Sequence, residues 1–184
     1  MGKMNPFIVL LLTLFFIVGC KSEKKENEKH INVFGYIKGQ LRHLDTIPYG
    51  ILKIRQVDTV ITDSTFIDIK KVREMVEPFM KLEPDEDYFN DHYTQSVFGD
   101  ATIGTITVSY LSKNGRDAIE RVDVYANPSN GDIKKVYILI REDEAKKIGK
   151  QQLLWTHNKG FSIFESSVAK DGSESIVTNK VIWQ

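Results

Sequence analysis

The chain has 184 residues and carries 25 basic and 25 acidic side chains, so its formal net charge at pH 7 is zero. Nucleic acids and acidic membrane surfaces usually select proteins with a one-sided basic excess, and this balance favours neither as a partner. Cys20 is the single cysteine, which excludes an internal disulfide and a zinc site built from several thiolates.

The first 20 residues have the three parts of a secretory signal. Lys3 supplies a positive charge, residues 7–18 form an almost unbroken apolar run, and residues 17–20 read Ile-Val-Gly-Cys. A bilayer-spanning helix needs about 20 apolar residues, and this run stops short of that before the charged stretch 21–29. The pattern resembles the lipobox of bacterial lipoproteins, in which the precursor is cut before the cysteine.

Resemblance to the bacterial lipoprotein class implies that residues 1–19 are removed and that Cys20 becomes lipidated on its sulfur and on its new amine. Several acyl chains would hold the protein to the membrane permanently, because each buried methylene contributes about 0.8 kcal/mol. Lys21, and not aspartate, follows the cysteine, which in that class favours the outer membrane of the cell envelope. The periplasmic and surface faces of that membrane both stay open, and an ordinary signal peptide remains the alternative.

The mature chain is expected to consist of a tether and one domain. Residues 20–30 form the lipidated cysteine and a flexible tether, because residues 21–30 are almost wholly charged or polar. About ten such residues have a root-mean-square span of roughly 17 Å. Residues 31–184 then form a single α+β domain, which is long enough to bury most of its unfolded surface.

Two amphipathic helices are predicted in the first half of this domain. Apolar residues follow helical spacing over residues 33–44, with Asn32 as the N-cap. The same spacing recurs over residues 69–79 behind Asp68, a second good N-cap, and Pro78 should end or kink this helix.

Short strands and turns account for the remainder. Residues 51–57 and 59–61 are predicted as two short β segments with a turn at Asp58, and residues 83–92 as a connection with about one helical turn. Residues 142–150 are expected to form a charged helical turn or a long loop. From residue 102 onward, apolar residues alternate with polar ones, and four turn signals separate the runs. These signals are Asn114-Gly115, Asn130-Gly131, residues 158–160 and Asp171-Gly172.

The predicted fold class is therefore α+β: an antiparallel β-meander of about five or six strands with two amphipathic helices packed on one face. Tyr125, Tyr137, Leu139 and Leu154 are expected on the opposite face.

The sequence shows no constellation for catalysis, for a metal or for a cofactor. The acidic stretch 85–92 lacks the turning glycine of calcium loops, and the four histidines do not pair at zinc-ligand spacing on one helix. No serine lies in a nucleophile elbow with flanking glycines. We therefore assign no catalytic, metal or cofactor residue.

Aromatic residues on the predicted strands give the candidate binding surface, which consists of Tyr125, Tyr137, Trp155 and Phe161. Large side chains with a polar tip dominate binding hot spots, although packing in the core is the alternative role. The favoured function is a noncatalytic binding or accessory module for an envelope protein. The alternatives are a carrier of a lipid or other apolar ligand and an envelope hydrolase.

Overall fold

The computed structural model describes residues 30–46, 48, 50–141, 150–168 and 172–183. It divides into the unit Met1–Ile31 and the unit Asn32–Gln184, and the second unit holds all of the described helices and strands. The predicted signal sequence, Cys20, the tether up to residue 29, most of the stretch 142–150 and Asp171 lie outside the described residues. None of the described helices is both long and apolar enough to cross a bilayer.

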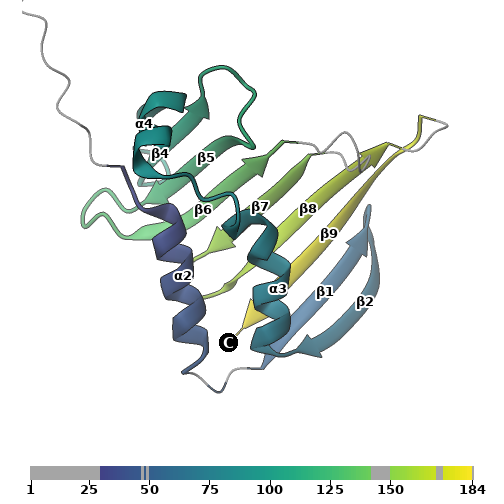
Figure 1. Cartoon of the computed structure of the whole chain (residues 1–184). Helices are drawn as coiled ribbons and strands as arrows, with labels where there is room; N and C mark the ends of the chain where they lie inside the picture. The colour runs from purple at the N-terminus through teal and green to yellow at the C-terminus, as the bar shows by residue number, and fades with distance from the viewer. Residues whose placement is uncertain (1–29, 47, 49, 142–149, 169–171, 184) are drawn as a thin grey trace, which may run out of the picture. The chain divides into compact units, whose positions relative to one another are not determined.

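Nine antiparallel strands form one open sheet (Figure 1), in the order β2-β1-β9-β8-β7-β6-β5-β4-β3. Strands β3 to β9 are a continuous meander, and β9 then pairs with β1, so the β1–β2 hairpin completes one edge. The strands are β1 (Ile51–Val57), β2 (Val60–Ile67), β3 (Tyr93–Asp100), β4 (Thr105–Ser112), β5 (Ile119–Ala126), β6 (Ile133–Ile140), β7 (Gln151–Thr156), β8 (Gly160–Val168) and β9 (Glu174–Trp183).

Three helices accompany the sheet in the described part of the chain: α2 (Val33–Leu44), α3 (Ile69–Met80) and α4 (Glu86–His92). The side chain of Asn32 accepts a hydrogen bond from Gly35 N at 2.7 Å. Asp68 accepts one from Lys71 N at 2.8 Å. Both predicted N-caps are thus confirmed. Pro78 lies inside the last turn of α3, and the helix ends two residues later.

The α+β class is confirmed, but the predicted numbers of strands and helices are wrong. The six strands β4 to β9 account for the meander expected after residue 102, while β1, β2 and β3 extend the same sheet to nine strands. Strand β2 continues to Ile67, beyond the predicted end at residue 61. The third helix, α4, replaces the single turn expected in the acidic connection.

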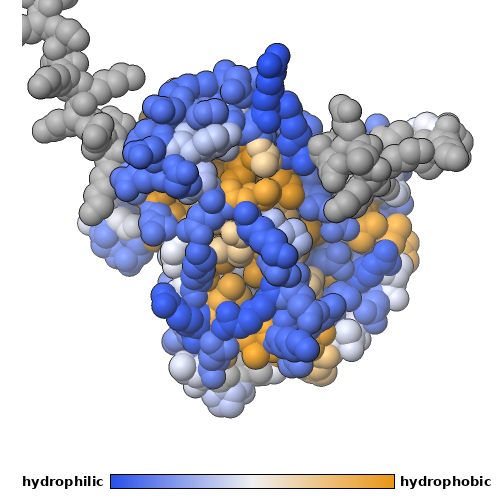
Figure 2. Space-filling model, in the orientation of Figure 1, coloured by the Kyte–Doolittle hydropathy of each residue, from blue (hydrophilic) through white to orange (hydrophobic). Residues whose placement is uncertain are grey.

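Helices α2 and α3 lie over one face of the sheet (Figure 1), and the buried apolar side chains of the two layers form the core. Ile37, Val72 and Phe79 are fully buried on the helices. Beneath them the ring of Trp155 stacks on Phe161 with centroids 5.2 Å apart, and Trp183 lies 5.6 Å from Trp155. Side chains on the outer surface of the helices are mostly hydrophilic, with apolar residues visible between them (Figure 2). Burial of this one face stabilises the two-layer arrangement.

Two glycines provide a matched test of the strand register. Gly160 has a φ of 145°, and a Cβ added there would lie 2.0 Å from the carbonyl oxygen of Val181, whereas a Cβ at Gly39 in α2 would meet open space. We expect Gly160→Ala to lower the free energy of unfolding by more than about 2 kcal/mol. The positive φ strains a residue with a side chain, and the Cβ would clash with the carbonyl oxygen of Val181.

Gly39→Ala should instead raise the free energy of unfolding by about 0.5–1 kcal/mol, because alanine loses less backbone freedom in a helix. Urea denaturation followed by circular dichroism measures both variants. Equal effects of the two substitutions would contradict the close approach of β8 to β9.

Candidate functional site

The face of the sheet opposite α2 and α3 is called the open face, because none of the described helices packs against it. Phe66, Leu52 and Ile182 are direct cross-strand neighbours there, on β2, β1 and β9. Phe66 is 76% exposed, and the other two side chains are partly exposed. Tyr137 and Leu154 form a second partly exposed pair across β6 and β7. The open face therefore presents apolar and aromatic groups to its surroundings.

The four aromatic residues of the predicted surface do not lie together. Tyr125 and Tyr137 are partly exposed on the open face, as expected from their alternation. Trp155 and Phe161 are 0% and 2% exposed, and both belong to the core beneath the helices. The prediction is corrected for these two residues, because their strands turn them toward the covered face of the sheet.

An ion pair between a half-exposed arginine and a buried aspartate lies beside the two tyrosines of the open face. Asp123 lies opposite Tyr137 in the register of β5 and β6, and its side chain is only 3% exposed. Arg121 Nε donates a hydrogen bond to Asp123 Oδ1 at 2.8 Å. Burial, and then the nearby charge of Asp123, raises the pKa of Tyr125; burial also raises the pKa of Tyr137. Both phenols therefore keep their protons and remain hydrogen-bond donors at neutral pH.

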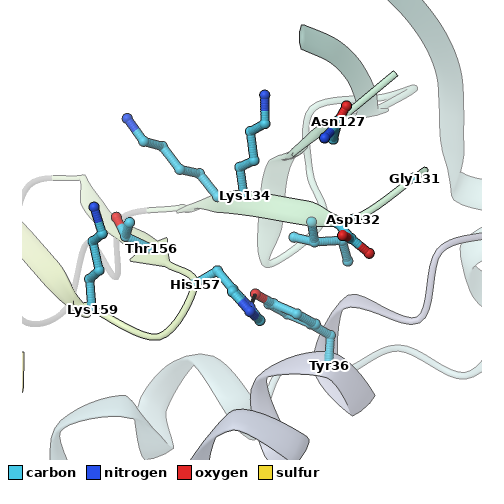
Figure 3. A pocket seen from close by; sticks show the side chains of 10 residues that line it. Tyr36, Asn127, Gly131, Asp132, Lys134, Thr156, His157 and Lys159 are labelled. Atoms are coloured by element: carbon cyan, nitrogen blue, oxygen red, sulfur yellow. Dashed lines mark hydrogen bonds between the residues drawn. The ribbon is translucent and has the colours of Figure 1, made fainter. Parts of the chain in front are cut away.

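A second feature, called the lysine pocket, lies at the end of the sheet where β6 begins and β7 ends, and it extends onto the open face, where Leu154 borders it. It combines a pocket of about 770 Å³ with an adjoining one of about 520 Å³, which share Thr156 and Lys159. Figure 3 shows Tyr36 of α2 meeting His157, with Lys134 and Lys159 extending from the sheet end.

The wall of the lysine pocket is held by a contact between the helix layer and the sheet. Tyr36 Oη and His157 Nδ1 are 2.7 Å apart and share a hydrogen bond. Burial raises the pKa of Tyr36 to about 12, so the phenol is neutral at physiological pH. The side chain of Gln40, also on α2, accepts a hydrogen bond from Asn158 N at 3.1 Å. These contacts join α2 to the β7–β8 turn.

The third feature, called the Asp117 cluster, consists of Tyr88, His92, Ser112 and Asp117. Asp117 Oδ1 accepts a hydrogen bond from Tyr88 Oη at 2.7 Å and lies 2.9 Å from His92 Nδ1, while Ser112 Oγ donates to Oδ2. Burial alone would raise the pKa of Asp117, but these hydrogen bonds and the charge of His92 outweigh it and lower the pKa to about 2. The cluster binds α4 to the β4–β5 turn.

The Asp117 cluster includes two residues of the acidic stretch 85–92, Tyr88 and His92. His92 pairs with Asp117, which lies in the turn that Asn114-Gly115 signals. Asp117 is buried, but its position as a charged residue in a turn did not predict this. In the described ranges, no group of three or more His, Cys, Asp or Glu side chains could hold a metal ion.

Comparison with known proteins adds no relative from which a role could be transferred. The chain matches no protein-family model, and neither a curated protein nor a solved structure is significantly similar to it. Its function is therefore argued from its own residues.

Asp117 gives the domain a dependence on pH in the acid range. Its pKa in the folded protein is about 2, below the ordinary value of 3.8. The charged carboxylate therefore stabilises the fold fully above about pH 4, and this contribution is lost as the pH falls through about 2. It amounts to about 2 kcal/mol at neutral pH.

We expect Asp117→Asn to lower the free energy of unfolding by a similar amount at pH 7 and to flatten this part of the pH profile. Urea unfolding across the acid range measures both effects. Asp87→Asn, on the exposed first turn of α4, serves as the control and should change little. A variant that kept the acid dependence of the natural chain would refute the assignment to Asp117.

Proposed function

We propose that this protein is a lipid-anchored lipoprotein of the bacterial envelope that acts as a noncatalytic binding or accessory module, with the open face as its contact surface. The observation that carries the binding role is the one-sided covering of the sheet: α2 and α3 bury one face, while the other presents Phe66, Tyr137 and Leu154. Aromatic residues, tyrosine among them, are enriched at protein interfaces and at their binding hot spots.

The anchor rests on the first 20 residues. A basic start, a short apolar run and Ile-Val-Gly-Cys precede the charged stretch, and Cys20 is the single thiol of the chain. The tether of about ten residues would leave the domain within a few tens of Å of the bilayer. Lys21 supports residence at the outer membrane by the sorting pattern of lipoproteins.

The use of the buried polar groups supports binding over catalysis. Both carboxylate oxygens of Asp117 are engaged in hydrogen bonds that join α4 to the sheet. Asp123 is held by Arg121 on its own strand. Each of these buried acids is occupied in holding neighbouring side chains, which is a structural role and leaves it poorly placed as a general base.

Lipidation is tested by metabolic labelling of the full-length precursor. The natural chain should incorporate radiolabelled palmitate and fractionate with the outer membrane, because acylated Cys20 is held by several buried chains. Cys20→Ser should incorporate no label and be lost from the outer-membrane fraction. An unmodified thiol on the natural mature chain, seen by intact-mass analysis, would overturn the anchor.

The open face is tested by site-specific photocrosslinking in intact cells. A photoreactive phenylalanine analogue at Tyr137 should give one discrete adduct with an envelope protein, and Phe66→Asp in the same chain should reduce its yield at least severalfold. The same analogue at Lys70, exposed on α3 over the opposite face, is the matched control and should give no such adduct. Identical adducts from both positions, or none from Tyr137, would contradict the proposed contact surface.

A further inference from the structure

The lysine pocket carries a local positive charge that the neutral composition of the chain conceals. Lys135, Lys159 and Lys180 have no carboxylate within salt-bridge distance among the described residues. Asp132 is the one acidic residue among the described residues that line the pocket, and its carboxylate accepts a hydrogen bond from Asn130 Nδ2. The ammonium groups are therefore available to an anion.

The strand register explains why these lysines surround a hollow. Lys135 lies opposite Thr156 in the register of β6 and β7, and Thr156 lies opposite Gly160 in the register of β7 and β8. Lys180 lies opposite Ser162 on the same face, two pairs further along β8 and β9. Hydroxyl and ammonium groups thus border the hollow, and both can donate hydrogen bonds to phosphate oxygens.

An exposed aliphatic side chain stands beside the lysines. Ile103, in the turn between β3 and β4, is 67% exposed. Lys134 Nζ donates a hydrogen bond to the carbonyl oxygen of the next residue, Gly104, at 3.0 Å, which ties this turn to the lysine pocket. Surfaces that rest on lipid bilayers combine an apolar group, which enters the interface, with lysines that meet the headgroups.

The point at which the chain enters the domain favours a membrane as the occupant. Tyr36, which lines the lysine pocket, is the fourth residue of α2, and α2 begins directly after the segment that carries Cys20. Since one helical turn rises only 5.4 Å, the tether joins the domain close to the pocket. A lipid anchor would therefore hold this end of the sheet near the bilayer that the anchor occupies.

We propose that the lysine pocket and Ile103 form a second, noncovalent membrane contact, which binds phosphate headgroups of anionic lipids in the bilayer that holds the anchor. This inference rests on the lipid anchor of the proposed function. The contact is weak alone, and tethering makes it effective by raising the local concentration of headgroups. Its role is to fix which way the domain faces on the membrane.

The contact is tested with the whole mature chain, residues 20–184, carrying Cys20→Ser so that no acyl chain is present. Cosedimentation is measured with vesicles of phosphatidylcholine alone and with vesicles that also contain phosphatidylglycerol, over a range of lipid and salt concentrations. We expect binding only to the anionic vesicles, with an affinity that falls as salt rises. Lys135→Gln with Lys159→Gln should weaken binding about 25-fold, at about fivefold for each lysine near the surface.

The matched control is Lys81→Gln with Arg116→Gln, which removes the same charge from exposed positions outside the pocket and should leave binding unchanged. Ile103→Ser should weaken binding severalfold without altering its salt dependence. Equal losses in the control and the pocket variants would overturn the proposal, as would no binding to anionic vesicles. Tight binding of soluble glycerol phosphate that displaces the vesicles would assign the pocket to a free phosphate ligand instead. Because the tested chain carries no lipid, each of these failures leaves the palmitate experiment on Cys20 unaffected.

Discussion

The antiparallel pairing of β9 with β1 is the contact on which the rest of the domain depends. It runs in continuous register from Ile51 opposite Trp183 to Val57 opposite Val177. Because α2 precedes β1 and α3 follows β2, this single pairing also brings both helices over the inner face of the meander. Trp155 and Phe161 are covered only when that has happened, so the formation of the core and the closure of the chain onto itself are one event.

Local signals in the sequence predicted the parts of the fold that local physics decides. Asn32 and Asp68 could be identified as helix caps, and period-two alternation located β4 to β9, because each of these features depends on neighbours within a few residues. The sequence predicted only the start of β2, and it did not predict β3. Both strands are edges of the sheet, and most of their side chains are exposed, so no buried face imposes an alternating pattern. Strand β9 pairs with β1, which lies more than a hundred residues earlier in the chain. Alternation within a strand does not indicate which other strand it pairs with.

The candidate binding surface was also predicted only in part, because alternation along a strand is a local signal. Tyr125 and Tyr137 could be placed on the face opposite the helices from their alternation, whereas Trp155 and Phe161 were grouped with them by residue type alone. Trp155 alternates in phase with Leu153, a buried residue, and this phase was the available signal for a core position. No feature of the sequence predicted the lysine pocket. The net charge of zero is a sum over the whole chain, so it does not show where lysines gather in the fold. Its lysines come from three different segments that only the sheet brings together.

The position of β9 also sets the order in which the molecule can be completed. A ribosome delivers the chain from its N-terminus, so the β1–β2 hairpin and both long helices emerge before the strand that must separate β1 from β8. Until β9 is available, β1 has an unpaired edge and the β1–β2 hairpin is not joined to the meander, and such intermediates are open to aggregation and to proteases. Completion of the sheet thus depends on β9, and a chain without β9 would lose the strand that joins the β1–β2 hairpin to the rest of the sheet.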